Sequence, residues 1–255
     1  MILAVDIGNT NVVMGLVDAG TIRHRWRTAS DAARTADEHE MLLRQLCQQS
    51  GVDVAEIGGS IVCSVVPALT ASFVEMLEKV TGADPVVVGP DLDLGVVVDY
   101  HDPHEVGPDR LANAVGVMGI VDGDAIVVDF GTATTFDVVT ADGHYLGGAI
   151  APGLLTSAEN LFRKAALLHG VALEPPSAAV GRSTEESLRS GIMFGAAGQV
   201  DEVVRRIVEE WATEPTVVAT GGLAGRIAPL TEAIDIVEPD LTLRGLALIY
   251  KRVKE

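Results

Sequence analysis

Short apolar runs alternate with longer segments of helical periodicity along most of the chain. The short runs are rich in Val and Ile and predict strands at 2–5, 12–17, 22–27, 60–65, 85–88, 125–129, 135–140, 216–219 and 234–237. Apolar positions three and four residues apart predict helices at 37–49, 69–81, 110–121, 154–168, 185–211 and 241–253. Strands that alternate with helices in this way indicate an α/β fold.

One part of this pattern occurs twice, about half a chain length apart. The run ILAVDIGNT begins at Ile2, and AIVVDFGTA begins 123 residues later, at Ala125. In both copies an apolar strand ends in Asp-x-Gly, and a second strand follows after a tight turn. Few positions are identical, so a chance likeness of two short motifs is the alternative. The interpretation we adopt is a duplicated α/β unit, with halves at 1–121 and 122–255 and a central cleft.

Composition limits the class of protein and of partner. The chain has 255 residues, 48% of them hydrophobic, which is enough to bury a core and argues against disorder. The formal net charge is −18, and such a charge repels nucleic acids and anionic membranes at long range. We therefore expect neither nucleic acid nor a membrane as a partner.

The cysteines and the N-terminus indicate the compartment. Cys47 and Cys63 are the only two cysteines, too few for a disulfide framework and without metal-ligand spacing, so we expect two buried thiols. The N-terminus has no basic leader, and no apolar run reaches about 18 residues. We expect a soluble, cytoplasmic protein.

The first Asp-x-Gly turn combines residues that suit phosphate. Asp6 ends a strand, Gly8 allows the backbone to approach a ligand, and Asn9, Thr10 and Asn11 add side-chain donors to the backbone N–H groups. The carboxylate of Asp6 could hold Mg²⁺, usually through water. The alternative is an ordinary hairpin turn.

The second turn, which contains Asp129, favours the phosphate interpretation. Two such turns could form a clamp for the phosphates of a nucleotide. The chain contains neither G-x-x-x-x-G-K-[ST] nor G-x-G-x-x-G, so nucleotide binding would have to use the paired hairpins. Gly221 and Gly222 follow a predicted strand and could lie against an adenosine, although a plain tight turn explains them equally well.

The segment before the third predicted helix carries candidate catalytic groups. Gly107 and Pro108 predict a turn, which places Asp109 at the helix N-cap with Arg110 as a surface partner. The alternative makes Asp109 a general base toward a hydroxyl and Arg110 a holder of an anion.

Two further segments are less specific. His101, Asp102 and His104 resemble metal ligands, but a zinc site needs more ligands at fixed geometry. The glycine-rich run at 147–153 is explained by a strand exit and a Pro-Gly helix start, and it could also line the substrate cleft.

Six motifs occur in one order over nearly the whole chain, at 6–10, 107–110, 129–137, 147–153, 181–184 and 220–222. Together they resemble the type III pantothenate kinases, which belong to the superfamily of acetate and sugar kinases, heat-shock ATPases and actin. The resemblance implies two ribonuclease-H-like halves. It also implies transfer of the γ-phosphoryl group of ATP to pantothenate, the first step of coenzyme A biosynthesis. The implied cofactors are Mg²⁺ with ATP and either K⁺ or NH₄⁺, and the implied assembly is a homodimer.

The resemblance also implies residue roles. The implied ATP contacts are Asp6, Ile7, Gly8, Asn9, Thr10, Asn11, Val12, Val13 and Thr132. The implied pantothenate contacts are Tyr100, Gly107, Pro108, Asp109, Arg110 and Thr184, with Asp109 as the proton acceptor. Asp129 is the implied ligand of the monovalent cation, and Asp6 lies near Mg²⁺.

Two other functions remain open from the sequence. One is a related kinase that acts on another small alcohol, against which the segment at 100–110 argues. The other is a nucleotide-binding regulator without catalysis, against which the presence of Asp6, Asp109 and Asp129 argues.

Overall fold

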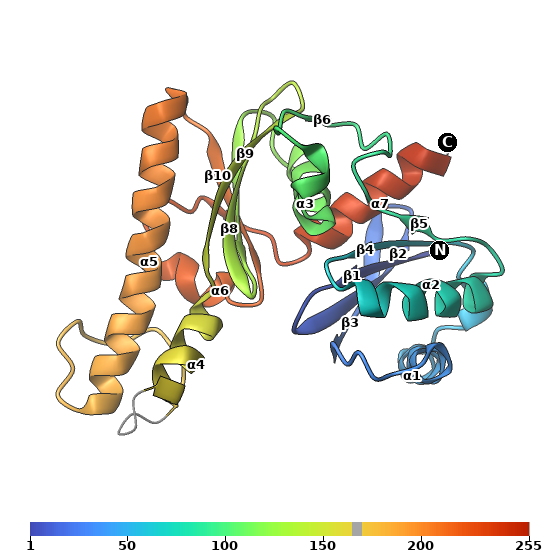
Figure 1. The fold of residues 1–255 in the computed structure, drawn as a ribbon, viewed down its shortest axis with the longest axis horizontal. Coiled ribbons are helices and arrows are strands. Elements are labelled where there is room, and N and C mark those ends of the chain that lie inside the picture. The colour runs from blue at the N-terminus through green and yellow to red at the C-terminus, as the bar shows by residue number, and fades with distance from the viewer. Residues whose placement is uncertain (165–169, 255) are drawn as a thin grey trace. The chain divides into compact units, whose positions relative to one another are not determined.

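The chain forms two compact units. The structure, a computed structural model, describes residues 1–164 and 170–254. Unit 1 comprises Met1–Ile120 and Leu241–Glu255, and unit 2 comprises Val121–Asp240. Figure 1 labels most of the helices and strands of both units. The predicted second half, 122–255, contains the C-terminal helix. In the structure this helix belongs to unit 1.

Unit 1 is built on a five-stranded sheet with the strand order β3-β2-β1-β4-β5. Its strands are β1 (Ile2–Ile7), β2 (Asn11–Asp18), β3 (Thr21–Ala29), β4 (Ser60–Ser64) and β5 (Val86–Val87). Its helices are α1 (Ala36–Gln49), α2 (Pro67–Thr81), α3 (Pro108–Met118) and α7 (Leu241–Lys254). Smaller elements of unit 1 are the strand β6 (Val97–Val98) and two 3-10 turns, Val54–Glu56 and Pro103–Glu105.

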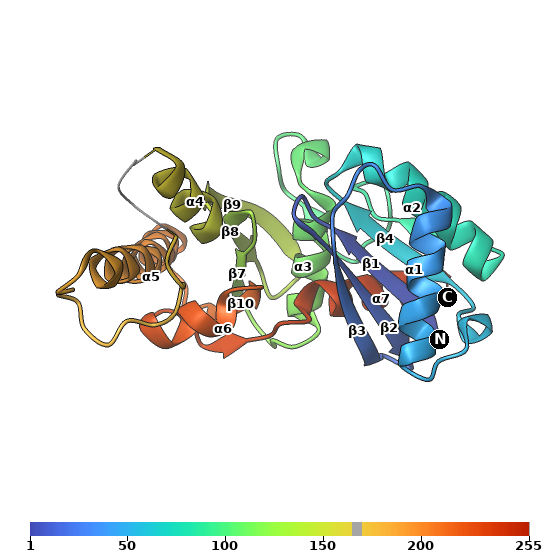
Figure 2. The same ribbon diagram turned by 90° about the horizontal axis from the view of Figure 1, so that it is seen from below.

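Helices cover both faces of the unit 1 sheet. Leu3, Val5 and Ile7 of β1 are fully buried in a core shared with α1 and α2. Neighbouring side chains of a strand point to opposite faces. Gly15 of β2 lies on the other face, where a Cβ would be 2.8 Å from Leu243 of α7. Figure 2 shows α1 and α2 on one side of these strands and α7 on the other.

The helices α3 and α7 cross at two glycines. A Cβ on Gly245 of α7 would lie 1.8 Å from the carbonyl oxygen of Ala112. A Cβ on Gly116 of α3 would lie 2.5 Å from the carbonyl oxygen of Leu241. The two backbones therefore approach closely enough that only glycine fits. This crossing explains why α7 belongs to unit 1 and helps to fix the position of α3.

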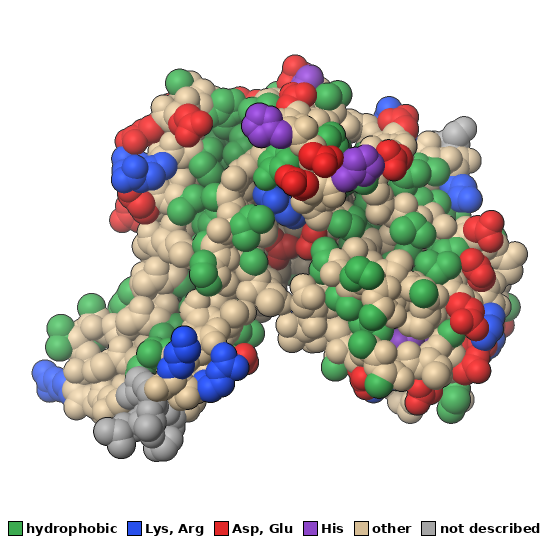
Figure 3. Space-filling view, viewed as in Figure 1, with side chains coloured by type: hydrophobic (Ala, Val, Ile, Leu, Met, Phe, Trp, Pro, Cys, Tyr) green, Lys and Arg blue, Asp and Glu red, His purple; other side chains and the backbone are tan. Residues whose placement is uncertain are grey.

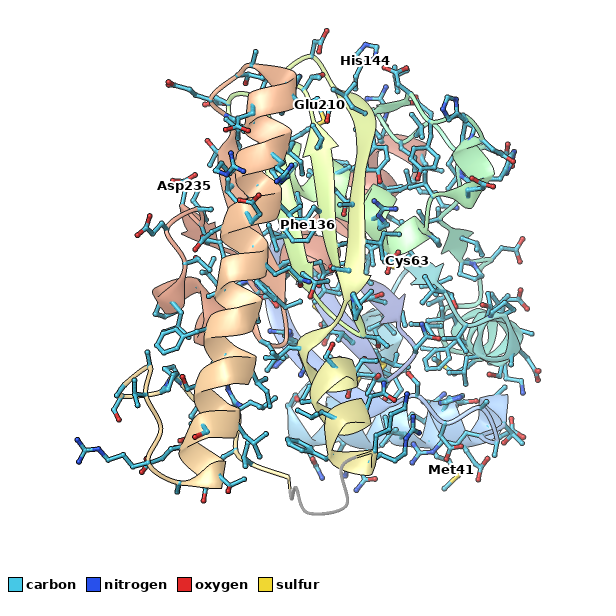
Figure 4. The ribbon with its side chains drawn as sticks, turned by 60° about the vertical axis from the view of Figure 1, so that its left-hand side comes forward. Met41, Cys63, Phe136, His144, Glu210 and Asp235 are labelled. Atoms are coloured by element: carbon cyan, nitrogen blue, oxygen red, sulfur yellow. The ribbon has the colours of Figure 1, made fainter. Side chains whose placement is uncertain are left out.

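Unit 2 repeats the design around a second sheet, in which five strands of this unit run β11-β10-β7-β8-β9. The strands are β7 (Ala125–Phe130), β8 (Ala133–Val139), β9 (His144–Pro152), β10 (Thr216–Gly221) and β11 (Ile236–Val237). The helices are α4 (Leu154–Lys164), α5 (Thr184–Trp211) and α6 (Ala224–Ile227), with a 3-10 turn at Ala228–Leu230. Phe136 of β8 and Met193 of α5 are fully buried in one core, and Figure 4 shows Phe136 behind α5.

The two sheets confirm the predicted duplication. Each begins with an antiparallel hairpin, β1-β2 or β7-β8, whose first strand also pairs in parallel with a later strand, β4 or β10. Read outward from the third strand of each unit, the orders β3-β2-β1-β4-β5 and β9-β8-β7-β10-β11 are the same. Two independent β-sheets with one topology are not expected from a chance likeness of short motifs.

The predicted elements are found with small differences in their ends. The strand β9 was not predicted, because its glycines 147 and 148 break the apolar alternation; both have positive φ. The helix predicted at 154–168 is described only to Lys164, and the rest of that prediction lies outside the described residues. The buried, free thiols of Cys47 and Cys63 agree with expectation.

The surface is strongly acidic. Figure 3 shows acidic side chains, in red, spread over the visible face of both units, as expected from a formal net charge of −18. In the described part of the chain, no helix combines the length and the apolar character needed to cross a membrane.

Candidate active site

The first candidate feature is the turn between β1 and β2. The side chains of Asn9, Thr10 and Asn11 are exposed at this turn. The N–H of Gly8 donates to the carbonyl oxygen of Asn11 at 3.0 Å, which closes the turn. An exposed turn with small polar side chains and backbone donors can bind phosphate oxygens.

Ser30, which follows β3, stabilises this turn with two hydrogen bonds. Its hydroxyl donates to the carbonyl oxygen of Gly8 at 2.5 Å, and its N–H donates to the carbonyl oxygen of Thr10 at 3.1 Å. Two carbonyl groups are thus directed toward Ser30. Ser30 is not among the predicted site residues, because no local signal connects it with a turn about twenty residues earlier in the chain.

Asp6 and Cys63 lie side by side where β1 and β4 approach their carboxyl ends. They are register partners in the parallel pair, so their side chains point to the same face of the sheet. The Sγ–H of Cys63 donates to Oδ1 of Asp6 at 3.4 Å. Figure 4 places Cys63 near the arrowhead of β4.

The N-terminus of α3 adds a second carboxylate to this end of the sheet. The helix begins at Pro108 with Gly107 as N-cap, so the prediction that Asp109 is the N-cap is wrong. Proline suits the first helical position, because its fixed φ is helical and its missing N–H needs no partner there. Asp109 stands one position further, and its Oδ1 accepts a hydrogen bond from the N–H of Arg110 at 2.9 Å.

Arg110 is not a surface residue. Only 6% of it is exposed, so the interpretation of Arg110 as a surface partner is wrong. A buried guanidinium is a strong source of positive charge beside the carboxylate of Asp109.

The environment shifts the acidity of Asp109 and Cys63. Burial raises the pKa of the Asp109 carboxyl above its ordinary value, although the N–H and the guanidinium of Arg110 lower that pKa. Burial also raises the pKa of the Cys63 thiol, and the charges of Asp6 and Asp109 raise it further. The thiol is therefore a hydrogen donor at neutral pH, while Asp109 is a carboxylate with enhanced proton affinity.

Unit 2 carries the second Asp-x-Gly turn. Thr132 is exposed in the turn between β7 and β8, and Asp129 is half-buried near the end of β7. Gly221, with φ of +90°, lies against Asp129: a Cβ there would be 2.5 Å from Oδ1 of Asp129 and 2.7 Å from the carbonyl oxygen of Phe130. A carboxylate oxygen and a carbonyl oxygen thus lie close together here, and both are ligand types that a hard cation binds.

The remaining candidate residues lie in the segment before α3 and at the start of α5. Tyr100 is half-buried in the segment before the 3-10 turn Pro103–Glu105. Asp102 caps that turn by accepting a hydrogen bond from the N–H of His104 at 3.0 Å. In unit 2, Thr184 is the exposed first residue of α5, and Ser183 is the N-cap.

The donor set near Asp6 fits Mg²⁺ bound together with a nucleotide. Among the described residues, no group of three or more His, Cys, Asp or Glu is placed to hold a metal ion. Mg²⁺ does not need such a group, because it binds through one or two carboxylates, substrate phosphates and water. The carboxylate of Asp6 beside an exposed phosphate-type turn meets that requirement.

Comparison with solved structures shows the fold. Component A of (R)-2-hydroxyglutaryl-CoA dehydratase from Acidaminococcus fermentans is 13% identical, with a TM-score of 0.59, and the match covers 100% of this chain and 99% of that chain. The ROK hexokinase from Thermus thermophilus is 16% identical, with a TM-score of 0.53, over 99% of both chains. The predicted fold, duplicated halves of the actin-like ATPase type, is confirmed.

Comparison of sequences shows the family. A model of the family "Type III pantothenate kinase" matches residues 2–206. The type III pantothenate kinase of Moorella thermoacetica is 46% identical over 252 residues, which are 99% of both chains. That of Bacillus cytotoxicus is 44% identical over 99% of this chain and 96% of its own. The chain therefore belongs to the type III pantothenate kinase family.

Proposed function

We propose that this protein transfers the γ-phosphoryl group of ATP to the primary hydroxyl of pantothenate and forms 4'-phosphopantothenate, the first step of coenzyme A biosynthesis. The observation that carries the proposal is the family match over residues 2–206. The carboxylates of Asp6 and Asp109, at the carboxyl end of the unit 1 sheet, are the groups that such a reaction needs.

The roles in phosphoryl transfer follow from the chemistry of each group. The reaction passes through a loose transition state, so positioning and charge stabilisation dominate. Asp109 orients the pantothenate hydroxyl and accepts its proton, for which a raised pKa is an advantage. Gly107, Pro108 and Arg110 contact pantothenate from the same helix start, and Tyr100 and Thr184 are further contacts.

The turn at 6–13 binds the phosphates of ATP, and Thr132 is a second ATP contact. Mg²⁺, when bound with ATP, neutralises charge on the phosphates. Asp6 holds the metal, directly or through water. Asp129 holds K⁺ or NH₄⁺, supported by the oxygen atoms around Gly221.

A homodimer is part of the proposal. One face of α5 carries Gly191, Gly195 and Gly198, on which a Cβ would meet nothing within 4 Å. Phe194 beside them is 37% exposed, and Leu155 of α4 is 45% exposed. Exposed apolar side chains beside open glycine positions suit contact with a second copy of the chain. Light scattering coupled to size-exclusion chromatography tests this assembly.

The expected location of the protein is the cytoplasm.

The experiment that tests the function measures ADP release by the purified protein with Mg-ATP and K⁺, with and without pantothenate. We expect release that depends on pantothenate and a product one phosphoryl group heavier by mass spectrometry. An analogue with hydrogen in place of the primary hydroxyl is the control and should give no release. Release with other small alcohols but not with pantothenate would favour a different kinase. ATP binding without any turnover would favour a regulator.

A further inference from the structure

Cys63 is a buried thiol directed at a carboxylate that the reaction uses. Its side chain is fully buried, and its Sγ–H donates to Oδ1 of Asp6 at 3.4 Å. Asp109 lies near enough that its charge acts on the same thiol. Cys63 therefore lies near both carboxylates to which the proposed function gives a role in unit 1: Asp6, which binds the metal, and Asp109, which accepts the proton.

The surroundings of Cys63 differ from those of an ordinary core cysteine, and the chain provides the comparison. Cys47 of α1 is also fully buried, but it belongs to the apolar core beneath α1 and α2. Cys63 points to the other face of the sheet, the face on which Asp6 lies. A small apolar residue would pack as well at Cys63, but it would offer Asp6 no hydrogen.

Unit 2 has a residue with a hydroxyl group at the equivalent position. Thr220 of β10 is the parallel register partner of Asp129, as Cys63 of β4 is the partner of Asp6. Thr220 is 1% exposed. In both units a residue with an S–H or O–H group thus stands beside the Asp that is next to last in the first strand. Two different side chains share that one property.

We propose that Cys63 is a positioning residue, whose S–H group fixes the orientation of the Asp6 carboxylate toward the metal bound with the nucleotide. The proposal rests on the proposed function. A carboxylate at the end of a strand can rotate, and a hydrogen bond to one of its oxygens selects one orientation. Groups that hold a metal-binding side chain in place commonly change metal affinity by about 10–100-fold when they are removed. The thiol is a weak donor, so we expect the lower end of that range.

The experiment compares Cys63→Ala with Cys47→Ala, because both changes remove a fully buried thiol. Binding of Mn²⁺ in the presence of a non-hydrolysable ATP analogue is measured by electron paramagnetic resonance, and the Tm is measured for each protein. We expect Cys63→Ala to weaken Mn²⁺ binding about tenfold. Cys47→Ala should lower the Tm through its cavity but leave Mn²⁺ binding as in the wild type.

A third variant separates the lost hydrogen bond from the lost volume. Cys63→Ser leaves a cavity similar to that of Cys63→Ala but retains a donor, so it should keep more of the Mn²⁺ affinity. In steady-state assays Cys63→Ala should raise KM for Mg-ATP and leave KM for pantothenate unchanged. Equal Mn²⁺ affinities in Cys63→Ala and Cys47→Ala, or in Cys63→Ala and Cys63→Ser, would overturn the proposal.

The same measurements keep the two proposals apart. If the wild type shows no pantothenate-dependent ADP release, the proposed function fails, yet the Mn²⁺ comparison still reports on Cys63. If the wild type turns over pantothenate and the Cys63 variants bind Mn²⁺ as it does, only the positioning role fails.

Discussion

Asp6 and Asp129 occupy equivalent positions in two sheets of the same topology. Each is the next-to-last residue of the first strand, and each pairs in parallel with a buried residue of the neighbouring strand, Cys63 or Thr220. The turns that follow differ, because Ile7 pairs with Val12 whereas Phe130 pairs with Thr134, so the first turn is one residue longer. The same sheet topology thus places a carboxylate beside a different turn in each unit. This difference suits the different cations that we propose for Asp6 and Asp129.

The role of Asp109 is tested by Asp109→Asn. The amide retains an oxygen for the N–H of Arg110 but accepts no proton, so kcat should fall about 10²–10⁴-fold. The affinity for ATP, measured by calorimetry, should remain as in the wild type. Asp102→Asn is the control, since Asp102 only caps a 3-10 turn nearby. An unchanged kcat in Asp109→Asn would remove Asp109 from its role.

The raised pKa of Asp109 predicts the pH dependence. As the pH falls through the pKa of Asp109, its carboxylate becomes protonated and can no longer accept a proton. The acid-side decline of kcat/KM should therefore lie at a pH above 3.8, the ordinary pKa of this carboxyl group. Because burial raises the pKa in the folded state, the native protein binds this proton at a higher pH than the unfolded chain does. Ionisation therefore destabilises the fold at neutral pH, and Asp109→Asn should raise the Tm there but not near pH 3. A rate profile that is flat down to pH 4 contradicts this assignment.

Ser30 predicts a selective effect on ATP. Ser30→Ala removes the hydrogen bond to Gly8, whose net contribution of about 1 kcal/mol corresponds to about a fivefold change. We expect KM for ATP to rise by that factor while KM for pantothenate stays the same. The control is Ser72→Ala in α2, which also removes a hydroxyl bonded to a carbonyl, that of Leu69. Equal rises in both KM values would indicate a general loss of structure instead.

The crossing of α3 and α7 predicts a stability effect. Gly245→Ala forces a methyl group into the carbonyl of Ala112, so the free energy of unfolding should fall by about 3 kcal/mol, as measured by urea denaturation. A displaced α3 should also lower kcat, because this helix carries Asp109. Gly225→Ala in α6 serves as the control, since a Cβ there meets nothing within 4 Å. A Gly245→Ala protein as stable as the wild type would show that the helices separate freely.

The cation site in unit 2 predicts a dependence on monovalent ions. In a buffer without K⁺ and NH₄⁺, the Kd for ATP, measured by calorimetry, should rise several-fold and recover when K⁺ is added. Asp129→Asn should bind ATP weakly under both conditions, because the amide lacks the charge that holds the cation. Asp142→Asn, in an exposed turn of the same unit, should respond to K⁺ like the wild type. If the Kd of the wild type for ATP does not depend on K⁺, Asp129 does not have this role.

Most of the elements could be predicted from the sequence because their signals are local. The apolar periods of β1 and α5 and the turn residues after Asp6 and Asp129 lie within short windows, and they correctly indicated two related halves. The strand β9 was missed because two glycines interrupt its pattern. The helix start was predicted two residues too late, with Asp109 instead of Gly107 as the N-cap, because a turn after Gly107 and a helix start at Pro108 have the same sequence signal.

The sequence by itself determined the duplicated α/β design, the family and the residues that are candidates for chemistry. Only the tertiary structure decided which distant residues support them. Cys63 reaches Asp6 through the parallel pairing of β4 with β1, Ser30 reaches Gly8 through the end of β3, and α7 joins unit 1 at the end of the chain. These relationships depend on strand pairing and helix packing between segments far apart in the chain, and such contacts leave no periodic pattern in the residues between them.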